Sequence, residues 1–133
     1  MSTLKVNTIQ DTSAGNSSTP AQILSGRAKA WCNMDSTGTE SIRAHYNMSS
    51  FTDNGDGDFV MNFDTDLANA DYIVVVSTSR NADSSTDPLQ WGGVHTKTTS
   101  NFGLNIWYTN SGLSTSSHKN DLAEYVDIVV FGV

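Results

Sequence analysis

The sequence has almost nothing that could cross-link the chain or hold it in a membrane. Cys32 is the only cysteine among 133 residues, so the chain cannot form an internal disulfide, and packing or assembly must hold its fold. No stretch approaches the roughly 20 apolar residues of a membrane span, and the N-terminus lacks the apolar core of a secretory signal. We therefore expect a chain that folds in a reducing cytoplasm.

Basic residues are also scarce, which argues against two kinds of partner. Seven lysines and arginines stand against fourteen acidic residues, and the formal net charge is -7. The seven are scattered along the chain, whereas nucleic acids and anionic membrane surfaces are bound by clustered basic side chains. The sequence therefore predicts no nucleic-acid partner and no membrane insertion.

The composition leaves little room for helices. Hydrophobic residues make up 37% of the chain and charged residues 16%, while Ser, Thr, Asn and Gly are abundant. Ser, Thr and Asn side chains compete with the helical backbone for hydrogen bonds, so this composition favours strands and turns. The length suits one domain with a single core.

Period-two alternation of apolar and polar residues runs through most of residues 41–131 and predicts about seven short strands. Turn-forming Gly, Asn, Asp and Ser separate them. We therefore expect an all-β fold, a small antiparallel β-sandwich or jelly-roll-like domain. The expected strands include segments at 42–48, 59–63, 72–77, 91–97, 102–108 and 124–131.

Three of these segments carry finer predictions. Alternation places four apolar side chains on one face of the first strand, namely Ile42, Ala44, Tyr46 and Met48. Residues 49–63 predict a hairpin around a turn rich in Asp and Gly. Residues 72–77 form a continuous apolar, β-branched run, which is typical of a central strand covered on both faces.

The opening of the chain differs from the rest. Leu4, Val6 and Ile9 offer too little apolar surface to fold alone, and the polar run that follows adds none. Thr19 and Pro20 with Gly26 predict one or two helical turns. The sequence thus predicts an attachment or oligomerisation arm over 1–27, docked on sister subunits or a larger particle through Leu4, Val6 and Ile9, and a β-sandwich domain over 28–133.

Residues that could perform chemistry fall into no recognisable motif. His45, His95 and His118 are interpreted as surface or strand-face residues. The aspartates of 53–71 fail the helix-loop-helix calcium pattern and are expected in solvated turns, with a non-standard oxygen site left open. Cys32 is expected to be buried and unreactive. We predict no catalytic residue, no cofactor and no metal.

Aromatic residues near amides form the one pattern that points to a ligand. Sugars are commonly bound by stacking on aromatic faces while amides contact their hydroxyls. Trp107 should point away from the core, because it alternates with Leu104 and Ile106. The alternative is that Trp107 packs against a sister subunit or under a loop. The candidate ligand- or receptor-binding residues are Trp91, Asn105, Trp107 and Tyr108, flanked by Gln90, His95, Asn101 and Asn110.

Four segments carry a family resemblance that covers most of residues 2–75. They are residues 2–11, Lys29-Ala-Trp31, residues 38–43 and residues 49–59. The most specific parts are Leu-Lys-Val-Asn-Thr-Ile-Gln at the start and the Thr-Asp-Asn-Gly turn that leads into Phe59. Through these segments the chain resembles tail-fibre-like structural proteins of bacteriophages, especially phages of marine bacteria.

The resemblance implies a protein of the virion, made in the host cytoplasm. In that family an arm joins a fibre or spike to the virion, and a small β domain, usually trimeric, faces the host. It therefore implies a homotrimer that contacts other virion proteins through the arm and a host-surface glycan or protein through the domain. Unlike typical tail fibres, the chain has no long shaft after Gly26, which favours a short spike, knob or fibre tip.

Three functions stay open from the sequence. The prediction is a non-enzymatic short tail-fibre or spike component that binds the host surface, and the first alternative is a capsid-decorating or head-fibre protein. The second alternative is a small polysaccharide depolymerase, which would need two carboxylates about 5 to 9 Å apart in one cleft.

Overall fold

A computed structural model describes residues 2–10, 12, 13, 15, 17–79, 90–108, 118, 119 and 123–132, with the backbone alone at 118 and 119. The predicted all-β fold is confirmed, because the long strands are antiparallel and form two packed sheets beside one short helix. The elements are β1 Ile9–Gln10, β2 Ser17–Ser18, α1 Pro20–Gly26, β3 Ala28–Asp35, β4 Ser41–Tyr46, β5 Ser50–Asp53, β6 Asp58–Asn62, β7 Ile73–Thr78, β8 Gln90–Lys97, β9 Asn101–Tyr108, β10 His118–Lys119 and β11 Val126–Phe131.

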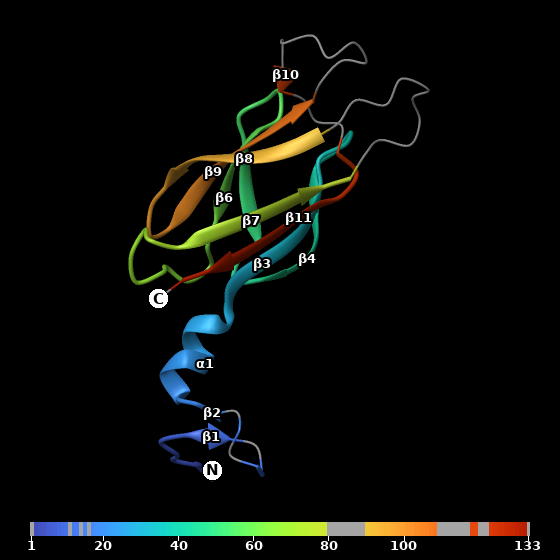
Figure 1. Ribbon diagram of the computed structural model, residues 1–133. Helices are drawn as coiled ribbons and strands as arrows, with labels where there is room; N and C mark the ends of the chain where they lie inside the picture. The colour runs from blue at the N-terminus through green and yellow to red at the C-terminus, as the bar shows by residue number, and fades with distance from the viewer. Residues whose placement is uncertain are drawn as a thin grey trace.

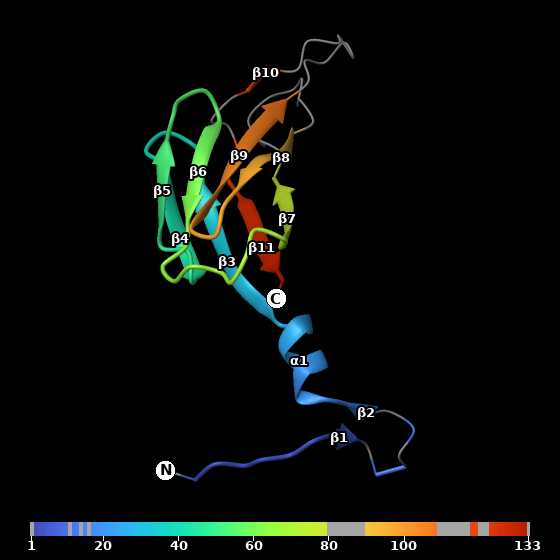
Figure 2. The same cartoon turned by 90° about the vertical axis from the view of Figure 1, so that its left-hand side faces the viewer.

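The two sheets stack as a sandwich (Figures 1 and 2). Sheet I has the strand order β4-β3-β11-β7. Sheet II is built around β9, which pairs with β8 along one edge and with β6 and β10 along the other, while β5 pairs with β6. The neighbours β7 and β8 belong to different sheets and meet at one side of the sandwich.

The core fills the space between the two sheets. The alternation predicted for 102–108 and 124–131 is confirmed, since every second side chain of β9 and β11 is buried. Tyr72 closes the core near the end of β6, with its ring centroid 5.4 Å from that of Phe63 and its hydroxyl 3.0 Å from the Thr98 carbonyl oxygen that accepts its hydrogen bond. Side chains that are at most 2% exposed include Ala30, Cys32, Met34, Phe59, Met61, Phe102, Leu104, Ile106, Val126, Ile128 and Val130.

The prediction that 72–77 is a central strand was wrong. Strand β7 lies at the edge of sheet I and pairs with β11 alone. Val74 and Val76 pack against the core, but Ile73 and Val75 face outward and are 66% and 52% exposed. The apolar run therefore has one face in the core and one face that the described domain leaves open.

The shared face predicted for Ile42, Ala44 and Tyr46 was also wrong. Met34 lies opposite Ile42 and Asn33 lies opposite Ala44, so Arg43 is an extra residue in β4. Such a bulge reverses the alternation, because side chains change face with every residue. Ile42 consequently packs against the core, whereas Ala44 and Tyr46 lie on the outer face.

The predicted hairpin over 49–63 is confirmed as β5 and β6, which pair from Ser50 opposite Asn62 to Asp53 opposite Phe59. The turn between them has left-handed backbone at three successive residues, Gly55, Asp56 and Gly57. The amide of Gly55 donates a 2.7 Å hydrogen bond to Asp53 Oδ1 and holds the turn closed.

The helix predicted after Thr19 is also confirmed, as α1. Thr19 caps it, since the Gln22 amide donates to Thr19 Oγ1 at 3.2 Å and the Thr19 amide donates to Gln22 Oε1 at 2.8 Å. The helix and the small β1-β2 hairpin extend from one end of the sandwich, the end at which β11 also finishes (Figures 1 and 2). The arm thus leaves the domain directly below sheet I.

Candidate functional sites

The outer face of sheet II gathers three of the four predicted ligand-binding residues. Trp91 of β8 lies directly opposite Trp107 of β9, and Asn105 lies between Gly93 of β8 and Asp58 of β6. Opposed residues in antiparallel strands project to the same side of the sheet. We call the surface formed by Asp58, Trp91, His95, Asn105 and Trp107 the aromatic-amide face.

Two glycines, Gly103 of β9 and Gly93 of β8, make room on this face for side chains of neighbouring residues. A Cβ atom at Gly103 would lie 2.3 Å from His95 Cε1, so only glycine lets the imidazole cross β9. His95 of β8 reaches across β9 toward β6, so its Nε2 lies 3.6 Å from Asp58 Oδ1. Trp107 Nε1 lies 3.8 Å from the position that a Cβ atom at Gly93 would take. The two glycines thus let the His95 and Trp107 side chains lie close over the backbone of the sheet.

Asn105 has an unmet hydrogen-bonding atom at the centre of the face. Its Oδ1 is buried and receives no hydrogen bond within the described structure. A buried acceptor without a donor costs about 1 to 3 kcal/mol, so such atoms usually mark a place for water or a ligand group. Asn105 Oδ1 is thus a buried polar atom beneath the aromatic-amide face that the described protein groups leave without a donor.

Tyr108 departs from the other three predicted residues. It follows Trp107 along β9 and lies opposite Gln90, so it projects to the other side of the sheet. Asp58 was missed as a member of the face, although the sequence placed it in an acidic turn. Asp58 lies beside Asn105 because β6 pairs with β9. The order of the strands in the sheet could not be predicted from the sequence.

The chemistry available here is recognition of a polar ligand with flat apolar faces. Trp91 is 41% exposed and Trp107 is half-buried, so the two indoles offer surface for stacking. Asn105, His95 and Asp58 supply donors and acceptors beside them. A pyranose ring has both features, an apolar face of C–H groups and a rim of hydroxyls.

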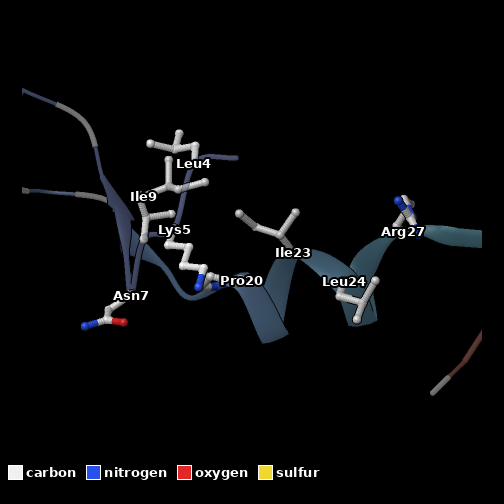
Figure 3. A pocket seen from close by; sticks show the side chains of 9 residues that line it. Leu4, Lys5, Asn7, Ile9, Pro20, Ile23, Leu24 and Arg27 are labelled. Carbon is white, nitrogen blue, oxygen red and sulfur yellow. The ribbon is translucent and has the colours of Figure 1, made fainter. Parts of the chain in front are cut away.

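The arm forms a second candidate site, made mainly of apolar side chains. Leu4, Val6 and Ile9 are 85%, 39% and 54% exposed, and Ile23 and Leu24 of α1 are 45% and 51% exposed. Figure 3 shows Leu4 and Ile9 together, with Ile23 facing them across an open pocket of about 490 Å³. The pocket is also lined by Val6, Pro20 and Leu24 and by the polar residues Lys5, Asn7 and Arg27.

The arm makes little use of its own domain. Apart from the half-buried Ser18, every described residue from 2 to 27 is exposed, and α1 buries none of its side chains. Its tie to the sandwich includes a 3.0 Å hydrogen bond from Lys29 Nζ to the Leu24 carbonyl oxygen. The apolar stripe of the arm is therefore open along its length.

The remaining reactive residues serve the fold. Cys32 is 2% exposed, and burial, together with the charge of Asp127, raises the pKa of its thiol to about 12. Asp53 accepts a hydrogen bond from Gly55 inside its own turn, and Asp64 accepts one from Ser49 in the connection between β4 and β5. In the described part of the chain, no three His, Cys, Asp or Glu side chains are grouped so that they could hold a metal ion. The side chain of His118 and residue Asn110 lie outside the described residues.

Comparison of the chain with protein-family models, curated proteins and solved structures finds no match. Over the described residues, no helix combines the length and apolar character needed to span a membrane.

Proposed function

We propose that this chain is a structural protein of a bacteriophage virion, a short tail-fibre or spike component. It assembles through its N-terminal arm and binds a glycan on the host surface through the aromatic-amide face. The observation that carries the proposal is the open apolar stripe of the arm, Leu4, Val6 and Ile9 with Ile23 and Leu24. The resemblance of residues 2–11 and 49–59 to phage fibre proteins supports the same assignment.

The arm supports assembly because the described residues of its own domain leave its apolar side chains exposed. Burying one Leu, Ile or Val side chain contributes about 1.5 to 3 kcal/mol. Five such side chains stay exposed in the isolated chain. Covering them on docking would therefore stabilise an assembly. Sister subunits and other virion proteins are the partners that fit an extended arm.

The aromatic-amide face supports glycan binding because it combines stacking surfaces with unmet polar capacity. Trp91 and Trp107 stand opposite each other, and the buried Oδ1 of Asn105 lacks a donor. The depolymerase alternative calls for two carboxylates in one cleft, whereas Asp58 is the one carboxylate among the described residues that form this face. Simple binding is therefore the function that this arrangement favours.

The test is binding of the full-length, fluorescently labelled protein to candidate host cells, with competition against phage adsorption. We expect saturable binding that blocks adsorption, and a loss of about tenfold or more in affinity for Trp107→Ala, as for other central aromatic contacts. Tyr125→Ala is the matched control, because it removes an exposed aromatic from the outer face of sheet I. Equal binding by both variants would reject the proposed site.

Failure of the assembled protein to bind any host cell would reject host recognition. Capsid decoration would then be tested by adding the protein to particles from which it has been removed. If the protein decorates the capsid, it should raise the thermal stability of the particle, and it should need the arm to do so.

A further inference from the structure

The turn between β5 and β6 contains a dipeptide that reacts slowly with water. Asn54 is followed by Gly55, and at no other place in the sequence does glycine follow asparagine. The backbone nitrogen of the following residue can attack the side-chain carbonyl of an asparagine and close a small ring. Glycine permits this attack best, because it has no Cβ atom to crowd the ring.

The structure leaves room for this ring to form. Asn54 and Gly55 are both exposed, so water reaches the side chain and the backbone nitrogen. Apart from the two chain neighbours of Gly55, no atom of the described structure lies within 4 Å of the position that a Cβ atom at Gly55 would take. The Asn54 side chain can therefore fold back over the Gly55 nitrogen without displacing another residue.

One contact opposes the reaction. The Gly55 amide must lose its proton before its nitrogen can attack, and this amide donates the 2.7 Å hydrogen bond to Asp53 Oδ1. A hydrogen bond to a charged acceptor is stronger than one between neutral groups, and the negative charge of the carboxylate further disfavours loss of the proton. The bond that closes the turn thus also holds the nitrogen in its unreactive form.

We propose that Asn54 is a site of spontaneous covalent modification and that the Asp53 carboxylate sets its rate. The Gly55 nitrogen gives its proton to hydroxide and bonds to Asn54 Cγ. The bond from Cγ to Nδ2 then breaks, and the leaving nitrogen takes a proton from water and departs as ammonia. Water opens the cyclic imide at either carbonyl and yields aspartate or isoaspartate. The inference concerns the chain alone and does not depend on binding to a host.

The modification lies next to the aromatic-amide face. The Asn54 amide donates to the Asp58 carbonyl oxygen at 2.8 Å, and the Asp58 amide donates to the Gly55 carbonyl oxygen at 3.1 Å. Isoaspartate inserts a methylene group into the backbone between residues 54 and 55, which lengthens the chain between these two bonds. We therefore expect the isoaspartyl form to weaken the turn that holds Asp58.

The test follows deamidation of the full-length, folded protein in mildly alkaline buffer. Mass spectrometry of proteolytic peptides measures the mass gained when hydroxyl replaces amine, and peptide fragmentation assigns isoaspartate to residue 54 rather than to Asp56. The internal reference is Asn69, a loop asparagine that is followed by Ala70. We expect Asn54 to convert faster than Asn69. Asn54→Gln is the matched control, because its longer side chain must close a larger ring, and it should stay intact.

Asp53→Ala tests the control of the rate. We expect conversion of Asn54 to become about tenfold faster, which is the effect on a barrier of losing one hydrogen bond to a charged group. Asp53→Asn keeps an oxygen acceptor in the turn and removes the charge, so its rate should lie between those of the parent chain and Asp53→Ala. Conversion of Asn54 no faster than that of Asn69 would overturn the site. Equal or slower conversion in both Asp53 variants would overturn its control by Asp53.

The two products separate the effect of charge from that of the backbone. Asn54→Asp carries the new charge on an unaltered main chain. We expect the isoaspartyl protein, purified from the incubated sample, to melt at a lower temperature than Asn54→Asp. Equal melting temperatures would show that the turn tolerates the inserted methylene group and would overturn the expected effect on Asp58.

Discussion

Two aspartates, Asp35 and Asp64, accept hydrogen bonds in loops and make the stability of the domain depend on pH. Thr37 donates to Asp35 Oδ1 through its hydroxyl at 2.6 Å and its amide at 2.9 Å, and Arg43 adds an ion pair. These contacts, led by Thr37, hold the pKa of Asp35 below its ordinary value. Ser49 does the same for the pKa of Asp64 through its hydroxyl and amide. The charged carboxylates accept these bonds more strongly than the protonated acids would.

We therefore predict that acid removes this stabilisation. A lowered carboxyl pKa contributes stability above the ordinary value of about 3.9, and the contribution is lost as the pH falls through the folded value. Asp35→Asn and Asp64→Asn should be less stable than the parent chain at pH 7, and the difference should shrink toward pH 3. Urea unfolding across this range measures it, with the exposed Asp66→Asn as control. A difference that does not change with pH would contradict the prediction.

At the scale of elements, the contact between β7 and β8 depends on two neighbouring glycines with opposite surroundings. A Cβ atom at Gly92 would lie 2.2 Å from Val76 Cγ1, inside the core. At Gly93 the closest atom is Trp107 Nε1 at 3.8 Å, an ordinary contact on the outer face. The two sheets can therefore meet at this side only because β8 has no side chain at position 92.

We predict that Gly92→Ala lowers the free energy of unfolding by about 1 to 3 kcal/mol, as other overpacked core sites do. Gly93→Ala should change it by less than about 1 kcal/mol, the range of strand surface substitutions. Chemical unfolding of both variants makes the comparison. Adding Val76→Ala to Gly92→Ala should restore part of the loss, and equal stability of the two single variants would argue against this packing.

The elements themselves were predictable because alternation is a local property. The β5-β6 hairpin, α1 and the burial of every second residue in β9 and β11 all follow from residue spacing. What could not be predicted was which faces of an element the rest of the fold covers. Ile73 and Val75 look like core residues in sequence, but they lie on the exposed outer face of an edge strand. The extra Arg43 in β4 likewise has no signal before its pairing with β3 is known.

The candidate site follows the same division. Trp91, Asn105 and Trp107 could be chosen from the sequence because their type and strand phase are local. Their arrangement could not, since it depends on the register between β8 and β9. Asp58 and His95 approach each other only across three strands, β6, β9 and β8, and no spacing in the sequence encodes that distance.

For the whole molecule, the core lies within the sandwich, and the arm is the part that we propose for assembly. Because the arm buries none of the core, we predict that residues 28–133 alone unfold cooperatively with a midpoint close to that of the full chain. This shortened chain should no longer join the virion. Thermal unfolding measures the first part, and incorporation into particles lacking the parent protein measures the second. Full incorporation of the shortened chain would contradict an attachment role for the arm.

The pairing of β3 with β11 in the middle of sheet I also sets an order of events during synthesis. β3 is the first strand of the sandwich to leave the ribosome and β11 is the last, yet they lie side by side from Ala28 to Met34. Sheet I therefore stays incomplete until nearly the whole domain has been made, and contacts this distant in sequence form slowly. The arm emerges long before that. The part of the chain that we propose for assembly is thus made before the sandwich can finish folding.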